Sequence, residues 1–423
     1  MRPPSKWSGR RMMITLPGVV ATILVGSVLL AGCGSAAIGS SATPTSTAAP
    51  ATAGVIPASS TEMASLPPAT SNPISELVGD PRRAGVWFWD LTSTGDVIYN
   101  VSGTGKLSAY PIFTGSSTIF EQGTSGLAVS SAGEVWFGIN TTLVELNPST
   151  GNIQTWAIPA GRGNPRDQPT STSDMAGHRA VNAIAVGPQG QVAIAMNSES
   201  SAELFNSATS EFTTLLLPTI TDKALSVTYA GDGSLCVGLS DLATGGHANQ
   251  LLLVDSSGAI STATVSGGTA WEVAPYATST FVVGSFDPHL VTSSGVVTAI
   301  EAPAALTGTA AAPTPLRPLP NGRLLGIADN GLIEFPINAT TPSSATAEAT
   351  MLTLPPIDCG GTAPNFGGPP DVGATPEPTP TPLPPGTLCP QHFGDINAVD
   401  GAGNIWFVES HAQAGVALVA PKG

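Results

Sequence analysis

Gly133-Glu-Val-Trp-Phe-Gly-Ile139 is followed by Thr142-Leu-Val-Glu-Leu-Asn-Pro148 and then by Asn152-Ile-Gln-Thr-Trp-Ala-Ile158. Each run is short and rich in β-branched or aromatic residues, and Ser149-Thr150-Gly151 separates the second run from the third. Apolar runs joined by glycine-containing turns are typical of antiparallel strands. Together with Leu127-Ala-Val-Ser130 before them, the three runs predict one four-stranded antiparallel sheet.

The same layout recurs along the chain, with an apolar strand, a turn and a second apolar strand in each segment. We predict the second strands at Asp96–Val101, Glu134–Ile139, Gln191–Met196, Ser234–Leu239, Thr280–Ser285, Arg323–Ala328 and Asn404–Glu409. Repeats of roughly 40 residues that each form four strands are typical of β-propellers. We therefore expect an all-β fold over residues 73–423, a seven-bladed β-propeller of four-stranded antiparallel blades. Rings of six or eight blades are the alternatives.

The last repeat ends one strand short, at Ala417-Leu-Val-Ala-Pro421. A propeller ring closes when a strand from one end of the chain completes the blade at the other end, so we predict that Pro73–Gly79 supplies the missing outer strand. Blades are stable only when their apolar faces pack against neighbouring blades. The large side chains expected to fill those interfaces are Trp136, Phe137, Trp406 and Phe407.

Residues 1–32 have the features of a secretory signal. Four positive residues precede the mostly apolar run Ile14–Leu30, and Leu30-Ala-Gly-Cys33 follows it. This arrangement resembles the bacterial lipobox, which implies cleavage before Cys33 and attachment of lipid to its thiol. The alternative is an uncleaved transmembrane helix, for which the run is short and broken by Pro17, Gly18 and Ser27.

Residues 33–72 are predicted to form a disordered tether between the lipid and the folded domain. The segment is rich in Ser, Thr, Ala and Pro and has few large apolar side chains, so it buries too little surface to offset the entropy of ordering. Acyl chains on Cys33 would anchor the protein without a spanning segment. We therefore expect a lipoprotein on the extracytoplasmic side of a bacterial cell membrane.

Two inserts interrupt the repeats, at Gly161–Ala180 and at about 355–393. The second is proline-rich and has Cys359 and Cys389 near its ends, and two cysteines outside the cytosol are expected to pair. We predict a Cys359–Cys389 disulfide, which would stabilise the fold by roughly 3–4 kcal/mol. Cys236 lies in an apolar run and is predicted to be a buried free thiol.

The charge of the chain argues against nucleic-acid binding. The formal net charge is −15, and loss of Arg2, Lys6, Arg10 and Arg11 with the leader makes it −19. An acidic surface repels phosphate backbones, and no basic stripe interleaved with aromatic residues occurs in the sequence.

Gly403-Asn-Ile-Trp-Phe-Val-Glu409 and Gly133-Glu-Val-Trp-Phe-Gly-Ile139 resemble the blade motif of the virginiamycin B lyase-like (streptogramin lyase) propeller family. That resemblance implies a Mg²⁺-dependent elimination with histidine as base. The candidate catalytic residues are Glu409, the acidic position of the motif, and His411. Their alternative roles are a carboxylate at the rim and a solvated imidazole in a loop.

Other catalytic motifs are absent from the sequence, including a Gly-x-Ser-x-Gly elbow and a phosphate-binding loop. We therefore expect a monomeric, lipid-anchored module that binds a protein, peptide or glycan through one face of the propeller, without a cofactor. A Mg²⁺-dependent lyase is the alternative. A third reading is envelope assembly, in which the proline-rich insert is the active part.

Overall fold

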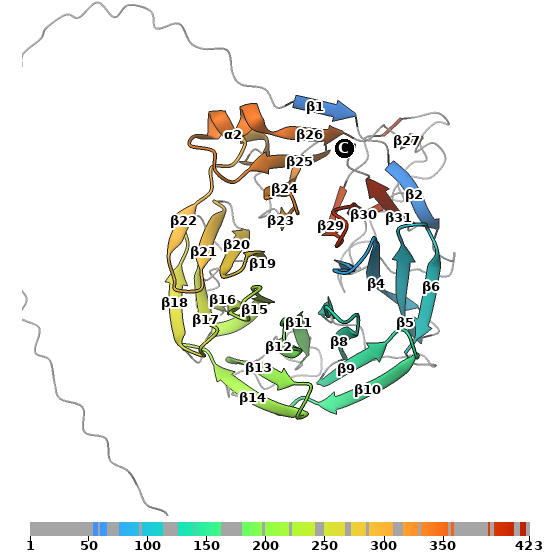
Figure 1. Ribbon diagram of the computed structural model, residues 1–423, viewed down its shortest axis with the longest axis vertical. Helices are drawn as coiled ribbons and strands as arrows, with labels where there is room; N and C mark the ends of the chain where they lie inside the picture. Colours follow the sequence, from blue (N-terminus) through green and yellow to red (C-terminus); the bar gives the residue numbers. More distant parts are fainter. Residues whose placement is uncertain are drawn as a thin grey trace, which may run out of the picture. The chain divides into compact units, whose positions relative to one another are not determined.

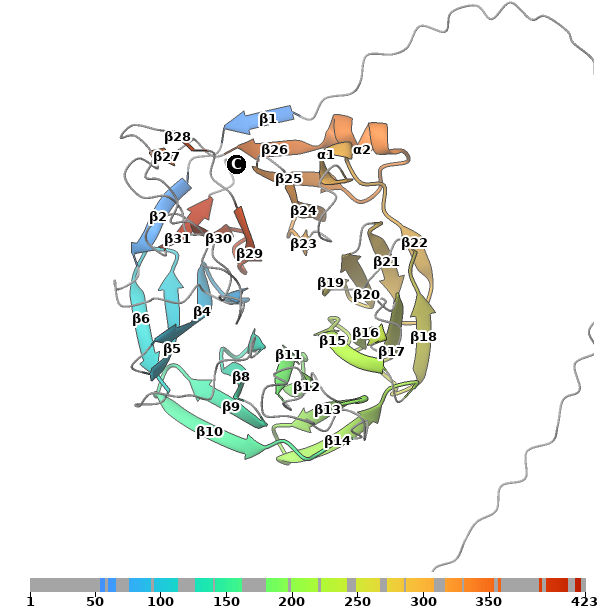
Figure 2. The same cartoon turned by 180° about the vertical axis from the view of Figure 1, so that it is seen from behind.

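The computed structural model describes residues 54–57, 60–65, 76–92, 95–112, 126–139, 141–161, 180–196, 199–219, 222–241, 249–266, 272–284, 287–307, 316–328, 331–353, 357–358, 388–389, 393–409 and 415–419. Most of these residues lie in strands, and the sheets stand around a common axis (Figures 1 and 2). Two short helices, α1 (Ala304–Thr307) and α2 (Pro342–Glu348), accompany them. Within the described part of the chain, neither helix has the length and apolar character needed to cross a membrane.

Six sheets have four strands, one has five, and a further pair of strands stands apart. The first blade contains β3 (Leu77–Gly79), β4 (Gly85–Thr92), β5 (Gly95–Ser102) and β6 (Leu107–Pro111). The second contains β7 (Leu127–Val129), β8 (Val135–Ile139), β9 (Thr142–Asn147) and β10 (Asn152–Ala157). The next contains β11 (Val181–Val186), β12 (Gln191–Met196), β13 (Ser201–Asn206) and β14 (Glu211–Leu216).

The chain continues in the same way. The following sheets contain β15 (Asp222–Tyr229), β16 (Leu235–Asp241), β17 (Gln250–Val254) and β18 (Ile260–Thr264), and then β19 (Glu272–Ala277), β20 (Thr280–Gly284), β21 (His289–Thr292) and β22 (Val297–Ala299). The five-stranded sheet contains β23 (Arg317–Pro318), β24 (Arg323–Ala328), β25 (Gly331–Pro336), β26 (Thr350–Thr353) and β1 (Gly54–Pro57). The last blade contains β29 (Phe393–Val399), β30 (Ile405–Glu409), β31 (Gly415–Val419) and β2 (Ser60–Ser65).

Neighbouring strands in the four-stranded sheets pair antiparallel. The protein is therefore an all-β propeller with four-stranded antiparallel blades, as the sequence predicts. Alternation of inward and outward side chains leaves both faces of each sheet apolar enough to pack against a neighbour.

Apolar clusters join each blade to the next. The ring of Trp89 in the first blade lies 4.8 Å from that of Phe137 in the second. Trp136 in turn contacts Phe205 of β13, with ring centroids 5.9 Å apart. Trp406 packs with the first blade and Phe407 with the five-stranded sheet. The prediction that Trp136, Phe137, Trp406 and Phe407 fill the interfaces between blades is confirmed.

The turn between the first two strands is built alike in the second and the last blade. In the second blade Ser130 N donates to Glu134 O, and Gly133 has φ 96°. In the last blade Asp400 N donates to Asn404 O, and Gly403 has φ 82°. Only glycine adopts this backbone conformation readily, so the glycines that mark the repeats in the sequence have a structural cause.

The first repeat was aligned incorrectly from the sequence. Asp96–Val101 lies in β5, the third strand of its blade, and the second strand is β4, which begins at Gly85. Val86 pairs with Gly79 as Ile405 pairs with Val399. In this register Asp90, and not Val101, occupies the position of Glu409 in the last blade.

A strand from the N-terminal part of the chain completes the last blade, as predicted, but it is not the predicted strand. The segment Pro73–Gly79 does not supply the outer strand of the last blade, because β3 pairs with β4 at the inner edge of the first blade. The outer strand is β2, which pairs antiparallel with β31, Ser60 with Val419 and Ser65 with Gly415. β1 pairs parallel with β26. Both strands lie inside the range 33–72 that was predicted to be a tether.

Several predictions fall outside the described residues: the leader 1–32, Cys33 and most of both inserts. Within the second insert, β27 (Ile357–Asp358) pairs with β28 (Leu388–Cys389). The Cys359–Cys389 disulfide stays a prediction.

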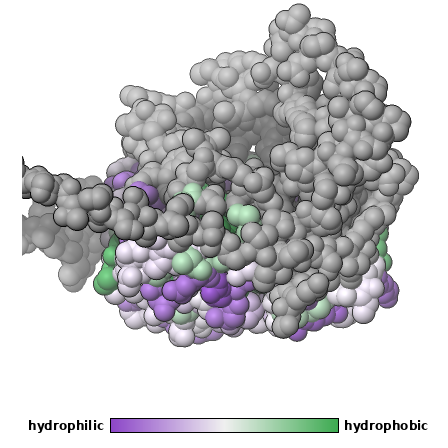
Figure 3. Space-filling model, turned by 90° about the horizontal axis from the view of Figure 1, so that it is seen from above, coloured by the Kyte–Doolittle hydropathy of each residue, from purple (hydrophilic) through white to green (hydrophobic). Residues whose placement is uncertain are grey.

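On the side of the molecule that Figure 3 shows, most of the coloured residues are white or purple, and green residues are scattered among them. Large apolar side chains that are exposed among the described residues occur singly in or beside outer strands: Ile153, Leu216, Ile260 and Val296. Isolated exposed apolar residues are ordinary on a soluble surface, so they do not mark a docking face.

Candidate functional site

A channel runs along the axis of the ring. Residues of the innermost strands β3, β7, β11, β15, β19, β23 and β29 line it, and its volume is about 720 Å³. Most of the lining residues are apolar, but Leu127, Ile184, Val227 and Val273 are buried in the clusters between blades, so they offer the channel little side-chain surface. A cavity of this size lies within the range of ligand-binding sites, roughly 300–1,000 Å³.

Few charged side chains interrupt the apolar wall. Glu272 of β19 forms an ion pair with Arg317 of β23, and both side chains are partly exposed to the channel. Asn182 donates from Nδ2 to the Leu225 carbonyl at 2.7 Å, which joins β11 to β15. These polar side chains of the channel wall therefore connect inner strands of different sheets.

Glu76, directly before β3, is the third charged residue of the channel. Its Oε2 accepts a hydrogen bond from Leu127 N at 2.8 Å. Burial raises the pKa of Glu76 to about 8, the charge of Glu272 adds to that rise, and the Leu127 hydrogen bond and Arg317 oppose it. Near neutral pH the channel thus holds a largely neutral carboxylic acid facing an ion pair.

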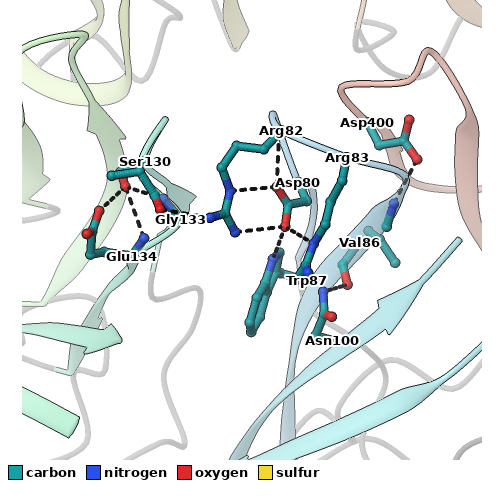
Figure 4. A network of polar contacts seen from close by, with 12 residues as sticks. Asp80, Arg82, Arg83, Val86, Trp87, Asn100, Ser130, Gly133, Glu134 and Asp400 are labelled. Atoms are coloured by element: carbon teal, nitrogen blue, oxygen red, sulfur yellow. Dashed lines mark hydrogen bonds and ion pairs between the residues drawn. The ribbon is translucent and has the colours of Figure 1, made fainter. Parts of the chain in front are cut away.

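A second group of polar contacts lies at the turn between β3 and β4 (Figure 4). Asp80 is fully buried and accepts hydrogen bonds from Arg82 Nε at 3.3 Å, Arg83 Nε at 3.0 Å and the Trp87 indole at 3.4 Å. Burial of Asp80 works to raise its pKa, but the hydrogen bonds and charge of the two arginines outweigh it and hold the pKa below its ordinary value.

Asp400 occupies the corresponding position in the last blade. It accepts hydrogen bonds from the Trp406 indole at 2.8 Å and from Asn404 Nδ2 at 2.9 Å. Here an asparagine amide satisfies the carboxylate that arginines satisfy in the first blade. In both blades the aspartate therefore fixes the turn and the tryptophan. The two arginines that also contact it occur in the first blade and have no counterpart among the described partners of Asp400.

Arg82 and Arg83 lie beside a pocket between the first and second blades, with a volume of about 380 Å³. Arg82 Nη1 donates to the Ala132 carbonyl of the second blade at 2.7 Å. Lys106, in the turn between β5 and β6, lines the same pocket. We call these three residues and the pocket they line the rim pocket.

The structure does not bring the predicted catalytic residues into a described site. Glu409 is the last residue of β30 and pairs with Phe393 and Gly415, but its side chain and His411 lie outside the described residues. Among the residues that are described, no three His, Cys, Asp or Glu side chains cluster as metal ligands would. The candidates Glu409 and His411 remain predictions.

Cys236 and His289 are buried in the blades. Cys236 in β16 is fully buried, and burial raises the pKa of its thiol, as predicted for an inert residue. His289 in β21 is also buried, with Nε2 3.0 Å from Ser266 Oγ, and burial lowers its pKa.

Sequence reasoning missed Glu76 and the Asp80–Arg83 turn. A signal for the second was present, because an aspartate is followed by tryptophan seven residues later at Asp80 and six residues later at Asp400. That spacing would have aligned the first repeat with the last one.

No family model and no curated protein matches this chain. A solved streptogramin B lyase structure is similar at a TM-score of 0.53 and 13% identity, over 85% of this chain and 97% of that one. The WD40 repeats of RRP9 are similar at a TM-score of 0.51 and 11% identity, over 82% and 94%. A chain of the mitotic checkpoint complex is similar at a TM-score of 0.53 and 12% identity, over 93% and 99%. The chain thus has a β-propeller fold with distant structural similarity to a streptogramin lyase and to WD40 propellers.

Proposed function

We propose that this chain is a membrane-anchored, extracytoplasmic propeller of seven blades that binds a peptide carrying a basic side chain in its central channel. The observation that carries the proposal is the placement of Glu76 in the channel wall beside the Glu272–Arg317 ion pair, which gives the wall one more acidic than basic side chain. An ammonium or guanidinium group beside Glu76 would favour its charged form and gain a charge-assisted hydrogen bond.

The wall favours a peptide over a glycan or a large protein surface. The innermost strands that line the channel are edge strands of their sheets. An edge strand offers backbone N–H and C=O groups with which the backbone of an extended peptide can pair. A channel of about 720 Å³ accepts a segment of a few residues and not a folded domain.

A matched pair of peptides tests this function. Acetyl-Val-Leu-Lys-amide and acetyl-Val-Leu-norleucine-amide differ in the ammonium group alone, and calorimetry at pH 7 measures their binding to the protein. The lysine peptide should bind more tightly by about tenfold or more, and its binding should release protons because Glu76 becomes ionised. Glu76→Gln should remove the proton release and most of the preference. Equal binding of both peptides, or none, would refute the proposal.

The lipid anchor is part of the proposal. About 20 residues separate Cys33 from β1, and a flexible chain of that length spans on the order of 25 Å, which keeps the ring clear of the membrane surface. Fractionation of the source cells should find the full chain with the membrane and a Cys33→Ser variant in the soluble extracytoplasmic fraction. Equal membrane retention of both would favour the uncleaved helix.

The second candidate function is a Mg²⁺-dependent lyase, favoured by the motif Gly403–Glu409. It requires Glu409 and His411 to act with a bound cation. Calorimetric titration of the protein with Mg²⁺, repeated on Glu409→Ala and His411→Ala, separates the two functions. Saturable Mg²⁺ binding that either substitution abolishes would favour the lyase.

A further inference from the structure

The rim pocket between the first and second blades gathers positive charge in an acidic protein. The whole chain has 14 Lys and Arg residues against 29 Asp and Glu residues. Three cationic residues, Arg82, Arg83 and Lys106, line this one pocket, and Glu134 is the single acid among its lining residues. An excess of positive charge in one concave place of an acidic surface attracts anions.

The turns of the first blade create this convergence. Gly103 N donates to the Ala84 carbonyl at 2.9 Å, so the β5–β6 turn rests on the β3–β4 turn, and Lys106 and Arg83 line one pocket. Asp80 accepts from Arg83 Nε at 3.0 Å and thereby orients its guanidinium group.

The hydrogen-bond donors of the rim pocket that have no protein partner indicate a ligand. Among the described residues, Nη1 and Nη2 of Arg83 and Nζ of Lys106 have no hydrogen-bonding partner, and the Arg83 side chain is 54% exposed. Arg82 donates hydrogen bonds to Asp80 and to the Ala132 carbonyl, so it contributes positive charge to the pocket but has few donors left for a ligand. Two unengaged nitrogens on one guanidinium form the fork that binds phosphate or carboxylate in a bidentate manner.

An equivalent turn elsewhere in the ring shows that Lys106 is not needed for folding. Thr292 N donates to Val296 O, Val296 N to Thr292 Oγ1, and Ser293 N to the Ser279 carbonyl, which reproduces the pattern of Ser102, Lys106 and Gly103. Val296 stands where Lys106 stands in the first blade, and it is 60% exposed. The same turn therefore forms with an aliphatic side chain at this position.

We propose that the rim pocket binds a phosphate monoester of a small polar molecule, with Arg83 and Lys106 as the ligating residues. Arg83 would bind the phosphate through the nitrogens that it does not use for Asp80, and Lys106 through its ammonium group. The pocket, at about 380 Å³, has room for a body of a few carbons with hydroxyl groups. The polar lining, which includes Asn100 and Ser108, suits such a body. This site is separate from the central channel, with which it shares no lining residue.

The test is calorimetry of the full-length protein in detergent at low salt with three probes: glycerol 3-phosphate, glycerate and glycerol. Glycerol 3-phosphate should bind, glycerate should bind about tenfold more weakly because it carries one charge, and glycerol should not bind. Lys106→Val, which copies the equivalent turn, and Arg83→Gln should each weaken binding of glycerol 3-phosphate by about tenfold or more.

Arg323→Gln removes one positive charge from the five-stranded sheet and is the matched control, which should leave binding unchanged. Thermal unfolding of each variant checks that its fold is intact. Absence of glycerol 3-phosphate binding, or binding that survives both Lys106→Val and Arg83→Gln, would overturn the proposal.

Discussion

Asp400 in the last blade accepts a hydrogen bond from the backbone N–H of Gly85 in the first blade, with Oδ2 2.9 Å from the nitrogen, although 315 positions separate them in the sequence. Asp400 is buried and also holds the Trp406 indole at 2.8 Å. The Gly401 N–H completes the junction by donating to the Asp80 carbonyl at 2.8 Å. One carboxylate thus fixes a turn, a core tryptophan and the junction between the two ends of the ring.

Asp400→Ala should lower the free energy of unfolding by about 3 kcal/mol or more, because several buried donors lose their acceptor at once. Urea unfolding followed by tryptophan fluorescence measures the change. Asp255→Ala is the matched control, since Asp255 caps an exposed turn through Ser257 and Ala259. The control should cost at most about 1 kcal/mol. Equal losses in both variants would contradict a special role for the junction.

The outer strand β2 makes a second prediction about closure. A protein that starts at residue 51 keeps β1 and β2, whereas one that starts at residue 67 lacks both. The shorter protein should unfold several degrees lower, because the loss of about 3 kcal/mol or more of strand pairing leaves an open edge on β31. Differential scanning calorimetry of both proteins measures this. Identical unfolding temperatures would mean that β2 contributes nothing to the ring.

Gly79 tests how closely the inner strands approach one another. A Cβ at Gly79 would overlap the Val399 carbonyl, which belongs to the backbone of β29 and cannot turn away. Gly79→Ala should therefore destabilise the protein by about 2 kcal/mol or more. At Gly231 a Cβ would lie 3.6 Å from Thr278 Cα, an ordinary contact, so Gly231→Ala should have little effect. Chemical unfolding of the two variants compares them directly.

The sequence predicted the repeated blades because their determinants are local. An apolar second strand recurs in each repeat and a glycine precedes it in most of them, and Gly133 and Gly403 have the backbone conformation that their positions imply. Ring closure is not local. β3 has three residues, Leu77–Gly79, and so short an apolar run fits an inner or an outer strand equally well. The polar segment Ser60–Ser65 becomes a strand through its pairing with β31, which no pattern in its own residues reveals.

The candidate sites were less predictable than the fold, for a related reason. Glu76 lies in the channel because β3 is an inner strand, and the incorrect alignment hid this. The rim pocket depends on two turns that meet in space through the Gly103 to Ala84 hydrogen bond. Single residues of unusual type, such as Arg82 and Arg83 in a chain poor in positive charge, were visible in the sequence, but their common pocket was not.

Cys236 provides a test of burial. Its thiol is fully buried and its pKa is raised, so iodoacetamide should modify it only after unfolding. Peptide mapping by mass spectrometry, with and without denaturant, measures the modification. The same maps without reduction should find Cys359 and Cys389 in one disulfide-linked peptide pair. Modification of Cys236 in the folded protein would show that β16 opens locally.

The raised pKa of Glu76 makes its contribution to the free energy of unfolding decrease as the pH rises. Its pKa is raised from 4.5 to about 8, so between these values the native state holds a proton that the unfolded chain has lost. The contribution of Glu76 to stability therefore falls as the pH rises through this window, by at most about 1.4 kcal/mol per pH unit and by less where channel water screens the group. The lowered pKa of His289 acts in the opposite sense, so the difference between the unmodified protein and Glu76→Gln isolates the Glu76 contribution. Glu76→Gln should flatten this slope and raise stability at pH 8 by about 1–3 kcal/mol.

Urea unfolding between pH 5 and pH 8 measures the slope. Glu211→Gln on the outer strand β14 removes one negative charge from an exposed position, and its slope should equal that of the unmodified protein. Glu211 is exposed on an outer strand and does not line the channel, so the comparison isolates the channel carboxylate. If Glu76→Gln and Glu211→Gln gave the same slope, Glu76 would be ionised in the folded protein, and water in the channel would solvate its charge.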